Sequence, residues 1–123
     1  MKQESRELLL KDLCGRLPYG VKIEVVENDD FSSIEVLDCY YLDKLDNKFY
    51  KIKPYLFPPQ SLPQAQKDEI CKVADGMEHG SCAERWDAMI KFVDLLNKYK
   101  VDYRDLIPNG LAKDATGLNL YEK

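Results

Sequence analysis

The most constraining feature of the sequence is a change in the spacing of its apolar residues near residue 60. Residues 21–27, VKIEVVE, alternate between apolar and charged side chains over their first five positions. Apolar residues at every second position are typical of a strand with one buried face. After residue 61 the apolar residues recur at every third or fourth position, which is the period of an amphipathic helix. The chain is therefore expected to have an α+β fold, with a small sheet followed by a helical C-terminal half.

Two further strands are predicted after the first. Residues 31–41 and 48–57 are rich in β-branched and aromatic side chains, and turn signals precede them at 28–30 and 43–47. Pro54 cannot donate to a ladder, so the third strand should bend there or lie at an edge. Three strands with short turns predict an antiparallel meander of three to five strands. A strong bend would curl such a meander into an SH3-like open barrel.

A helix is predicted before the sheet, because four leucines, Leu9, Leu10, Leu13 and Leu17, recur near helical spacing. Gly15 is a candidate for its C-terminal stop, and the residues LPYG at 17–20 are expected to turn the chain. The first helix after the sheet should begin with a capping box made by Ser61 and Gln64. Its predicted apolar stripe comprises Ile70, Val73, Ala74 and Met77.

The longest predicted helix covers roughly residues 82–100 and begins with a second capping box, made by Ser81 and Glu84. It has two apolar stripes, so its apolar arc is wider than that of an ordinary surface helix. Such a helix is either the central strut of the domain or half of an interface, and the strut is the commoner case. The first stripe is Trp86, Met89, Ile90, Val93 and Leu96, and the second is Phe92, Leu95 and Tyr99.

The segment 102–112 is expected to fold onto the core as a C-terminal clamp. Asp102 can cap a short helix there, and the spacing of its apolar residues points them inward. Those residues are Tyr103, Leu106 and Ile107. A docking motif is the alternative interpretation.

Length and charge limit the classes of function. With 123 residues, 45% of them apolar, the chain can form one domain over 1–123, with the sheet in 1–60 and the helical half in 61–123. The net charge of −4 disfavours general binding to duplex DNA or RNA, whose phosphates repel it. No apolar run approaches the length that spans a bilayer, and the first residues do not read as a secretory signal. We therefore expect a cytoplasmic protein without a membrane partner.

No pattern in the chain predicts catalysis or a cofactor. The sequence lacks the GxSxG, GxGxxG and GxxxxGK[ST] motifs. Its four cysteines form no CxxC pair, so reduced and mostly buried thiols are expected. Cys71, His79 and Cys82 fall short of the four closely spaced ligands of a zinc site. We therefore predict a protein that is not an enzyme and binds no cofactor or metal.

Aromatic residues and lysines are interleaved around the second and third predicted strands. Such a surface could stack on single-stranded bases or bind a protein, although a packed sheet is the commonest use of strand aromatics. The lysines are Lys44, Lys48, Lys51 and Lys53. Together with the second stripe of the long helix, this region supplies the candidate interaction surface: Tyr40, Tyr41, Tyr50, Lys51, Lys53, Tyr55, Phe57, Phe92, Leu95 and Tyr99.

Three phrases of the sequence resemble a group of small proteins found in Bacteroidales genomes and their phages or mobile elements. The phrases are LLLKDLCGRLPYGVKIEV, IKPYLFPPQSL and DYRDLIPNGLAKDATGLNLY. The group has no assigned activity, so the resemblance implies only a bacterial or phage origin and a cytoplasmic setting. Pro108 departs from the group's pattern and argues against a full helix through 103–112.

Two functions follow from these expectations. The first is a non-enzymatic protein-interaction module of a bacterial or phage accessory protein, with an unknown protein partner or a second copy bound through the long helix. The alternative is a module that binds single-stranded nucleic acid with the tyrosine- and lysine-rich sheet.

Overall fold

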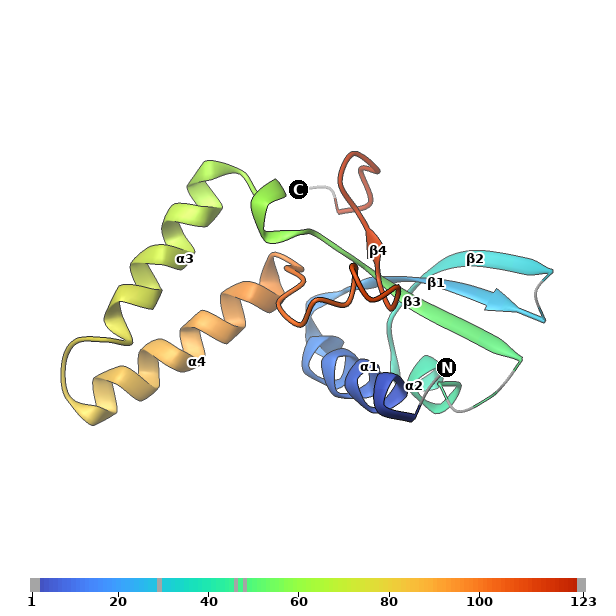
Figure 1. The fold of residues 1–123 in the computed structure, drawn as a ribbon, viewed down its shortest axis with the longest axis horizontal. Helices are drawn as coiled ribbons and strands as arrows, with labels where there is room; N and C mark the ends of the chain where they lie inside the picture. The colour runs from blue at the N-terminus through green and yellow to red at the C-terminus, as the bar shows by residue number, and fades with distance from the viewer. Residues whose placement is uncertain (1–2, 29, 46, 48, 122–123) are drawn as a thin grey trace.

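A four-stranded sheet with helices on one face forms one end of the protein, and a helical hairpin forms the other (Figure 1). The computed structural model describes residues 3–28, 30–45, 47 and 49–121, so the predicted strand residue Lys48 and the turn residues Asp29 and Asp46 lie outside it. The elements in chain order are α1 (Gln3–Arg16), η1 (Leu17–Tyr19), β1 (Lys22–Glu27), β2 (Phe31–Val36), α2 (Cys39–Asp43), β3 (Tyr50–Leu56), η2 (Pro59–Ser61), α3 (Gln64–Gly76), α4 (Cys82–Lys98) and β4 (Lys113–Asp114). The predicted α+β class is confirmed.

The strand order of the sheet is β2-β1-β3-β4, which differs from that of a meander. β1 pairs with both β2 and β3 in antiparallel fashion, and the two-residue β4 pairs with β3 in parallel. The connection from β2 to β3 therefore passes β1 and carries α2 on the way. β2 and β4 are the two ends of this order, and the described residues show no pairing that closes it into a barrel.

Pro54 lies within β3 at a position where the strand pairs with a neighbour on one side only. Its partner across the β1–β3 ladder is Ile23, whereas β4 pairs only with Tyr55 and Leu56. A residue without an N–H group fits such a position, because no strand lies on the other side to accept a bond from it. This is one of the two outcomes that the sequence predicted.

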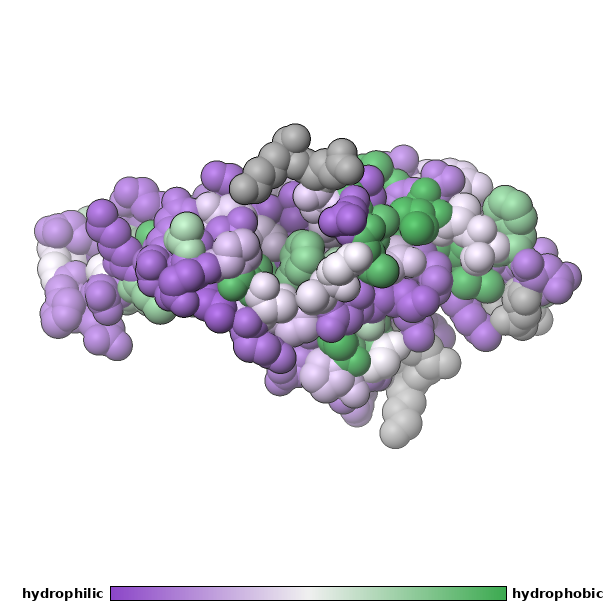
Figure 2. All heavy atoms as spheres, turned by 90° about the horizontal axis from the view of Figure 1, so that it is seen from above, coloured by the Kyte–Doolittle hydropathy of each residue, from purple (hydrophilic) through white to green (hydrophobic). Residues whose placement is uncertain are grey.

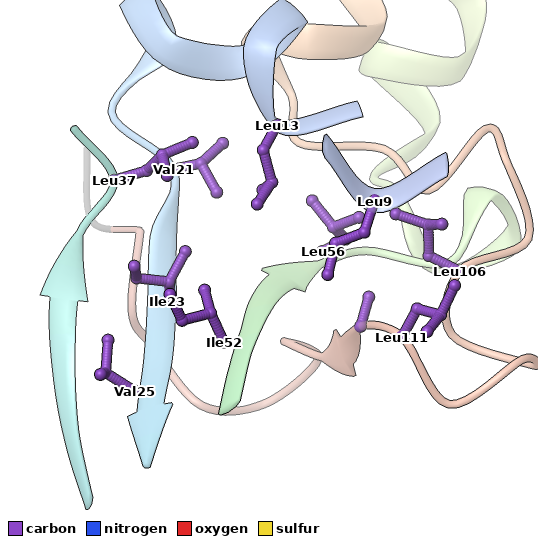
Figure 3. Close-up of a cluster of buried hydrophobic side chains, with 11 residues drawn as sticks. Leu9, Leu13, Val21, Ile23, Val25, Leu37, Ile52, Leu56, Leu106 and Leu111 are labelled. Atoms are coloured by element: carbon purple, nitrogen blue, oxygen red, sulfur yellow. The ribbon is translucent and has the colours of Figure 1, made fainter. Parts of the chain in front are cut away.

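The main core lies between α1 and one face of the sheet. Leu9 and Leu13 of α1 are completely buried and point toward Ile23, Ile52 and Leu56 of the strands (Figure 3). The alternation of β1 explains its part of this core, because every second side chain of a strand faces the same way.

Two predicted caps differ from those in the structure. α1 continues past Gly15 into η1, and the left-handed residue is Gly20, with φ of 68°. Ser61 does not cap α3, because its hydroxyl donates to the carbonyl of Pro58 at 2.7 Å while Pro63 occupies the N-cap position. The box of Ser81 and Glu84 at the start of α4 is present as predicted.

The second half of the predicted strand 31–41 is helical. β2 ends at Val36, and α2 begins after Asp38, whose carboxylate accepts a hydrogen bond from the amide of Tyr41 at 3.3 Å. An aspartate in this position satisfies an amide that has no partner within the helix, which favours a helix start over continued strand. The two tyrosines of this segment therefore leave the sheet.

The segment 102–112 folds onto the core without forming a helix. The two carboxylate oxygens of Asp102 accept from the amides of Leu106 and Ile107, each at 2.9 Å. Leu106 is completely buried in the main core and Ile107 packs against that core. The inward direction of these residues is as predicted, and turns replace the expected short helix.

A second, smaller cluster joins the helical hairpin to the sheet. Its buried members are Leu62, Leu96 and Val101, which come from the link between η2 and α3, the end of α4 and the segment after it. Beyond this cluster α3 and α4 run side by side and extend away from the sheet (Figure 1). None of the residues of α3 is buried, and in α4 only Leu96 and Asn97 are.

Candidate interaction surface

The two apolar stripes of α4 have different surroundings. Phe92 and Tyr99 pack against the second cluster. Leu95 is half-buried and faces Val73 of α3 across a cavity of 380 Å³ that Tyr19 also lines. The hydroxyl of Tyr19 donates to Asp94 at 2.7 Å and ties the hairpin to η1. This second stripe is thus the side of α4 that packs against the rest of the protein.

Most of the first stripe is exposed. The exposed fractions are 67% for Trp86, 50% for Met89, 63% for Ile90 and 47% for Val93, and only Leu96 at its end is buried. The prediction that α4 is a buried central strut is therefore wrong. α1 already covers the core face of the sheet, so α4 packs against α3 along the hairpin and reaches the buried cluster at the sheet end only with its C-terminal residues.

The four exposed side chains form one continuous row, which we call the α4 stripe. Their spacing of i, i+3, i+4 and i+7 places them on one side of the helix over about 10 Å of its length. Asp87 and Lys91 form an exposed ion pair at 3.0 Å on the same helix. A row of large apolar side chains with polar neighbours is typical of a protein-binding surface.

The tyrosines predicted to lie on one sheet surface are separated in the structure. Tyr40 and Tyr41 belong to α2, where their rings meet edge to face with centroids 5.1 Å apart. Tyr50 packs against the main core from the first position of β3, and the ammonium of Lys44 lies 5.5 Å from its ring centroid. These residues are on the helix-covered side of the sheet.

The remaining sheet candidates lie in three different environments. Lys51 and Lys53 pair with Val26 and Glu24 on the face of the sheet opposite Ile52. Tyr55 is buried, with 6% of its surface exposed, and Phe57 packs in the second cluster. The described residues therefore do not assemble the alternating aromatic and basic surface on which single-stranded bases stack.

The open face of the sheet carries exposed apolar residues outside the predicted interaction surface. Ile34 and Val36 of β2 are about half exposed, and the register places them across from Glu24 and Lys22. In the view from above, apolar side chains gather over the strands (Figure 2). The signal was present in the alternation of FSSIEV, but the sequence could not say which face α1 covers.

A buried charge network joins α1 to the C-terminal segment. Asp12 and Arg16 are both fully buried and form a two-bond ion pair, with a shortest distance of 2.7 Å. Arg16 also donates to the carbonyl of Val101 at 2.6 Å, and Arg104 donates to Asp12 at 3.2 Å. Both oxygens of Asp12 accept hydrogen bonds and both arginines donate within the fold, while Arg16 Nη1 is buried without a hydrogen-bond partner among the described residues. The bonds of this network are a structural tie between α1 and the C-terminal segment.

All four cysteines are free and exposed, so the predicted burial of the thiols is wrong. They lie on the solvent sides of α1, α2, α3 and α4, which pack through their other faces. Among the described residues no group of three or more His, Cys, Asp or Glu side chains is placed to hold a metal ion. In the same part of the chain no helix is long and apolar enough to cross a membrane.

Comparisons with protein-family models, with curated proteins and with solved structures find no match to this chain. Function is therefore inferred from the geometry of α4 and of the cavities.

Proposed function

We propose that the protein is a non-enzymatic interaction module that binds an amphipathic helix of a partner protein along the α4 stripe. One observation carries this proposal: four large apolar side chains in a single helical row are about half to two-thirds exposed. Tryptophan and methionine are residue types that often dominate binding energy or adapt to a partner's shape. The resemblance to Bacteroidales and phage proteins is consistent with an accessory protein that acts on a bacterial host protein.

A helix is the partner structure that best fits a narrow row. The α4 stripe is one helical face wide, and helices pack along such rows through side chains at i, i+3, i+4 and i+7. Asp87 and Lys91 form an exposed ion pair on the same helix as the row. We therefore expect polar residues that match this ion pair next to the apolar face of the partner helix.

The proposal is tested by capturing partners from a Bacteroidales lysate with tagged protein. Ile90→Asp places a charge in the centre of the α4 stripe, whereas Ile34→Asp makes the same change at a comparably exposed apolar site on the sheet. We expect a specific partner with wild type and with Ile34→Asp, and its loss with Ile90→Asp. Both substitutions should leave the melting temperature nearly unchanged, because surface substitutions seldom alter stability.

The single tryptophan then provides a direct readout with the purified partner. Trp86 is 67% exposed in the free protein, so its fluorescence emission should shift to shorter wavelength when a partner covers it. Retention of the partner by Ile90→Asp would contradict the proposal. Sedimentation of wild type as a dimer and of Ile90→Asp as a monomer would identify a second copy as the occupant instead.

A further inference from the structure

A cavity of 610 Å³ lies where the start of α3, the end of α4 and a C-terminal segment with Thr116, Gly117 and Tyr121 meet. Its volume is within the range of sites that hold small molecules in proteins. The segments that enclose it are far apart in the sequence, and they include Pro63, Tyr99 and Thr116. It is separate from the α4 stripe, none of whose residues line it.

Aromatic rings form part of the wall of this cavity. Phe57 and Tyr121 lie with their ring centroids 5.8 Å apart and their planes at 57°, and Tyr99 also faces the space. The Tyr121 ring is held in place because its hydroxyl accepts from the amide of Lys22 and donates to the carbonyl of Tyr55, both at 2.7 Å. A fixed aromatic wall suits a ligand that carries a flat ring.

The charged residues in the described lining of the cavity are two lysines. Lys98 and Lys100 line it, and no Asp or Glu is among its described lining residues, although the chain as a whole is acidic. The Lys100 ammonium donates to the carbonyl of Lys98 at 3.0 Å and lies 5.1 Å from the centroid of the Tyr121 ring. A neighbouring cavity of 520 Å³ shares Lys100 and Tyr121 and adds Lys22, again without a carboxylate in the described lining.

Lys100 has an unusual backbone conformation for a lysine. Its φ is 55°, in the left-handed region that residues with a Cβ seldom adopt. Its carbonyl accepts from the amide of Phe57 at 2.8 Å and its amide donates to the carbonyl of Asn97 at 3.1 Å, so the fold holds it there. The amide of Val101 also donates to the carbonyl of Leu96 at 2.9 Å, so Lys100 is the left-handed residue of the turn that ends α4, and this turn fixes where its side chain leaves the backbone beside the cavity.

Two further features favour an anion in this cavity. Partial burial lowers the pKa of Lys100, because it removes water from around the ammonium group. No carboxylate in the described lining of the cavity compensates for the lost water. α3 begins beside the cavity after Pro63, without a side-chain cap. The amides of a helix start carry partial positive charge, which adds to that of the two lysines.

We propose that this cavity binds a nucleoside monophosphate, with its base against Phe57 and Tyr121 and its phosphate at Lys98 and Lys100. The flat base of such a ligand matches the aromatic part of the cavity wall, and its phosphate matches the part that carries the two lysines. Lys98 and Lys100 are binding residues in this proposal, and no reaction is implied.

The proposal is tested by titrating adenosine 5′-monophosphate into the labelled protein and following backbone amide chemical shifts. Lys100→Gln and Lys98→Gln each remove one positive charge from the cavity, and Lys72→Gln removes one from the exposed side of α3 as a matched control. We expect shifts at Phe57, Thr116 and Tyr121, and an affinity about tenfold lower in each cavity variant, because a charge-assisted hydrogen bond is lost.

Inorganic phosphate and adenosine, added separately, should each bind more weakly than the monophosphate. The Ile90→Asp variant should bind the monophosphate with the affinity of wild type, because Ile90 does not line the cavity. The monophosphate titration therefore tests the cavity independently of whether the α4 stripe binds a partner. Absence of shifts at the cavity, or equal weakening in Lys72→Gln, overturns the proposal. Binding of single-stranded oligonucleotides that requires Lys51 and Lys53, without monophosphate binding, overturns it as well.

Discussion

At the scale of single residues, Tyr121 shows how one side chain can hold the end of the chain to the sheet. Its hydroxyl bridges the backbones of Lys22 in β1 and Tyr55 in β3. Burial is the largest cause that raises the pKa of Tyr121, to about 12. A tyrosine in the unfolded chain has a pKa of about 10. The folded state thus keeps a proton that the unfolded state loses at alkaline pH.

We predict from this that Tyr121→Phe reduces the loss of stability at high pH. A group with a raised pKa in the folded state stabilises fully below about pH 10, and this contribution is lost as pH rises toward about 12. The unfolding free energy of wild type should therefore fall by roughly 2–3 kcal/mol more than that of Tyr121→Phe over this interval. Urea unfolding at several pH values measures how steeply the unfolding free energy falls with pH in wild type and in Tyr121→Phe. The other tyrosines remain in the variant, and equal slopes would contradict the prediction.

At the scale of elements, the segment 102–112 acts as a clamp through a few buried groups. Leu106 is completely buried, whereas Leu118, farther along the same C-terminal region, is 51% exposed. We predict that Leu106→Ala lowers the unfolding free energy by about 2–5 kcal/mol, because it leaves a cavity in the main core. Leu118→Ala should change it by less than about 0.5 kcal/mol. Urea unfolding tests the pair, and an unchanged Leu106→Ala would show that the segment does not stabilise the fold.

The local pattern of the sequence was enough to predict most elements. Alternation identified β1, helical spacing identified α1 and α4, and the box of Ser81 and Glu84 marked where α4 begins. α2 was missed because Tyr40 and Tyr41 favour strands in general, whereas the cap at Asp38 decides the outcome here. The preference of tyrosine for strands comes from the packing of its side chain against neighbouring strands. The sequence of one segment does not show whether such neighbours are present.

The position of an element relative to others was harder to predict. The wide apolar arc of α4 is visible in the sequence, but whether another element covers it depends on the path of the whole chain. The α4 stripe is exposed because α1 occupies the core face of the sheet. The cavity at Lys100 was not foreseen for the same reason, since its lining residues come from segments that meet only in the folded structure.

At the scale of the whole molecule, the protein has a well-packed end and a sparsely packed end. The main cluster joins α1, the sheet and the C-terminal segment, with eleven buried residues. The second cluster has three, all near the base of the hairpin. Because local stability follows the density of buried apolar contacts, the two ends should open with different free energies. The α4 stripe lies on the end that opens more easily, so a bound partner would stabilise it.

We predict that backbone amides of α3 and of the first half of α4 exchange with solvent faster than those of β1 and β3. The reason is that α3 has no buried residue and α4 has only Leu96 and Asn97, whereas Ile23 and Ile52 lie in the main core. Hydrogen exchange measured by mass spectrometry on the free protein gives this comparison. Leu106→Ala serves as a control, because it should increase the exchange rate of the sheet amides more than that of the hairpin amides. A partner bound at the α4 stripe should slow exchange around Met89 by coupling local opening to binding. Equal protection of α3 and β1 in the free protein would show instead that the hairpin and the sheet unfold as one cooperative unit.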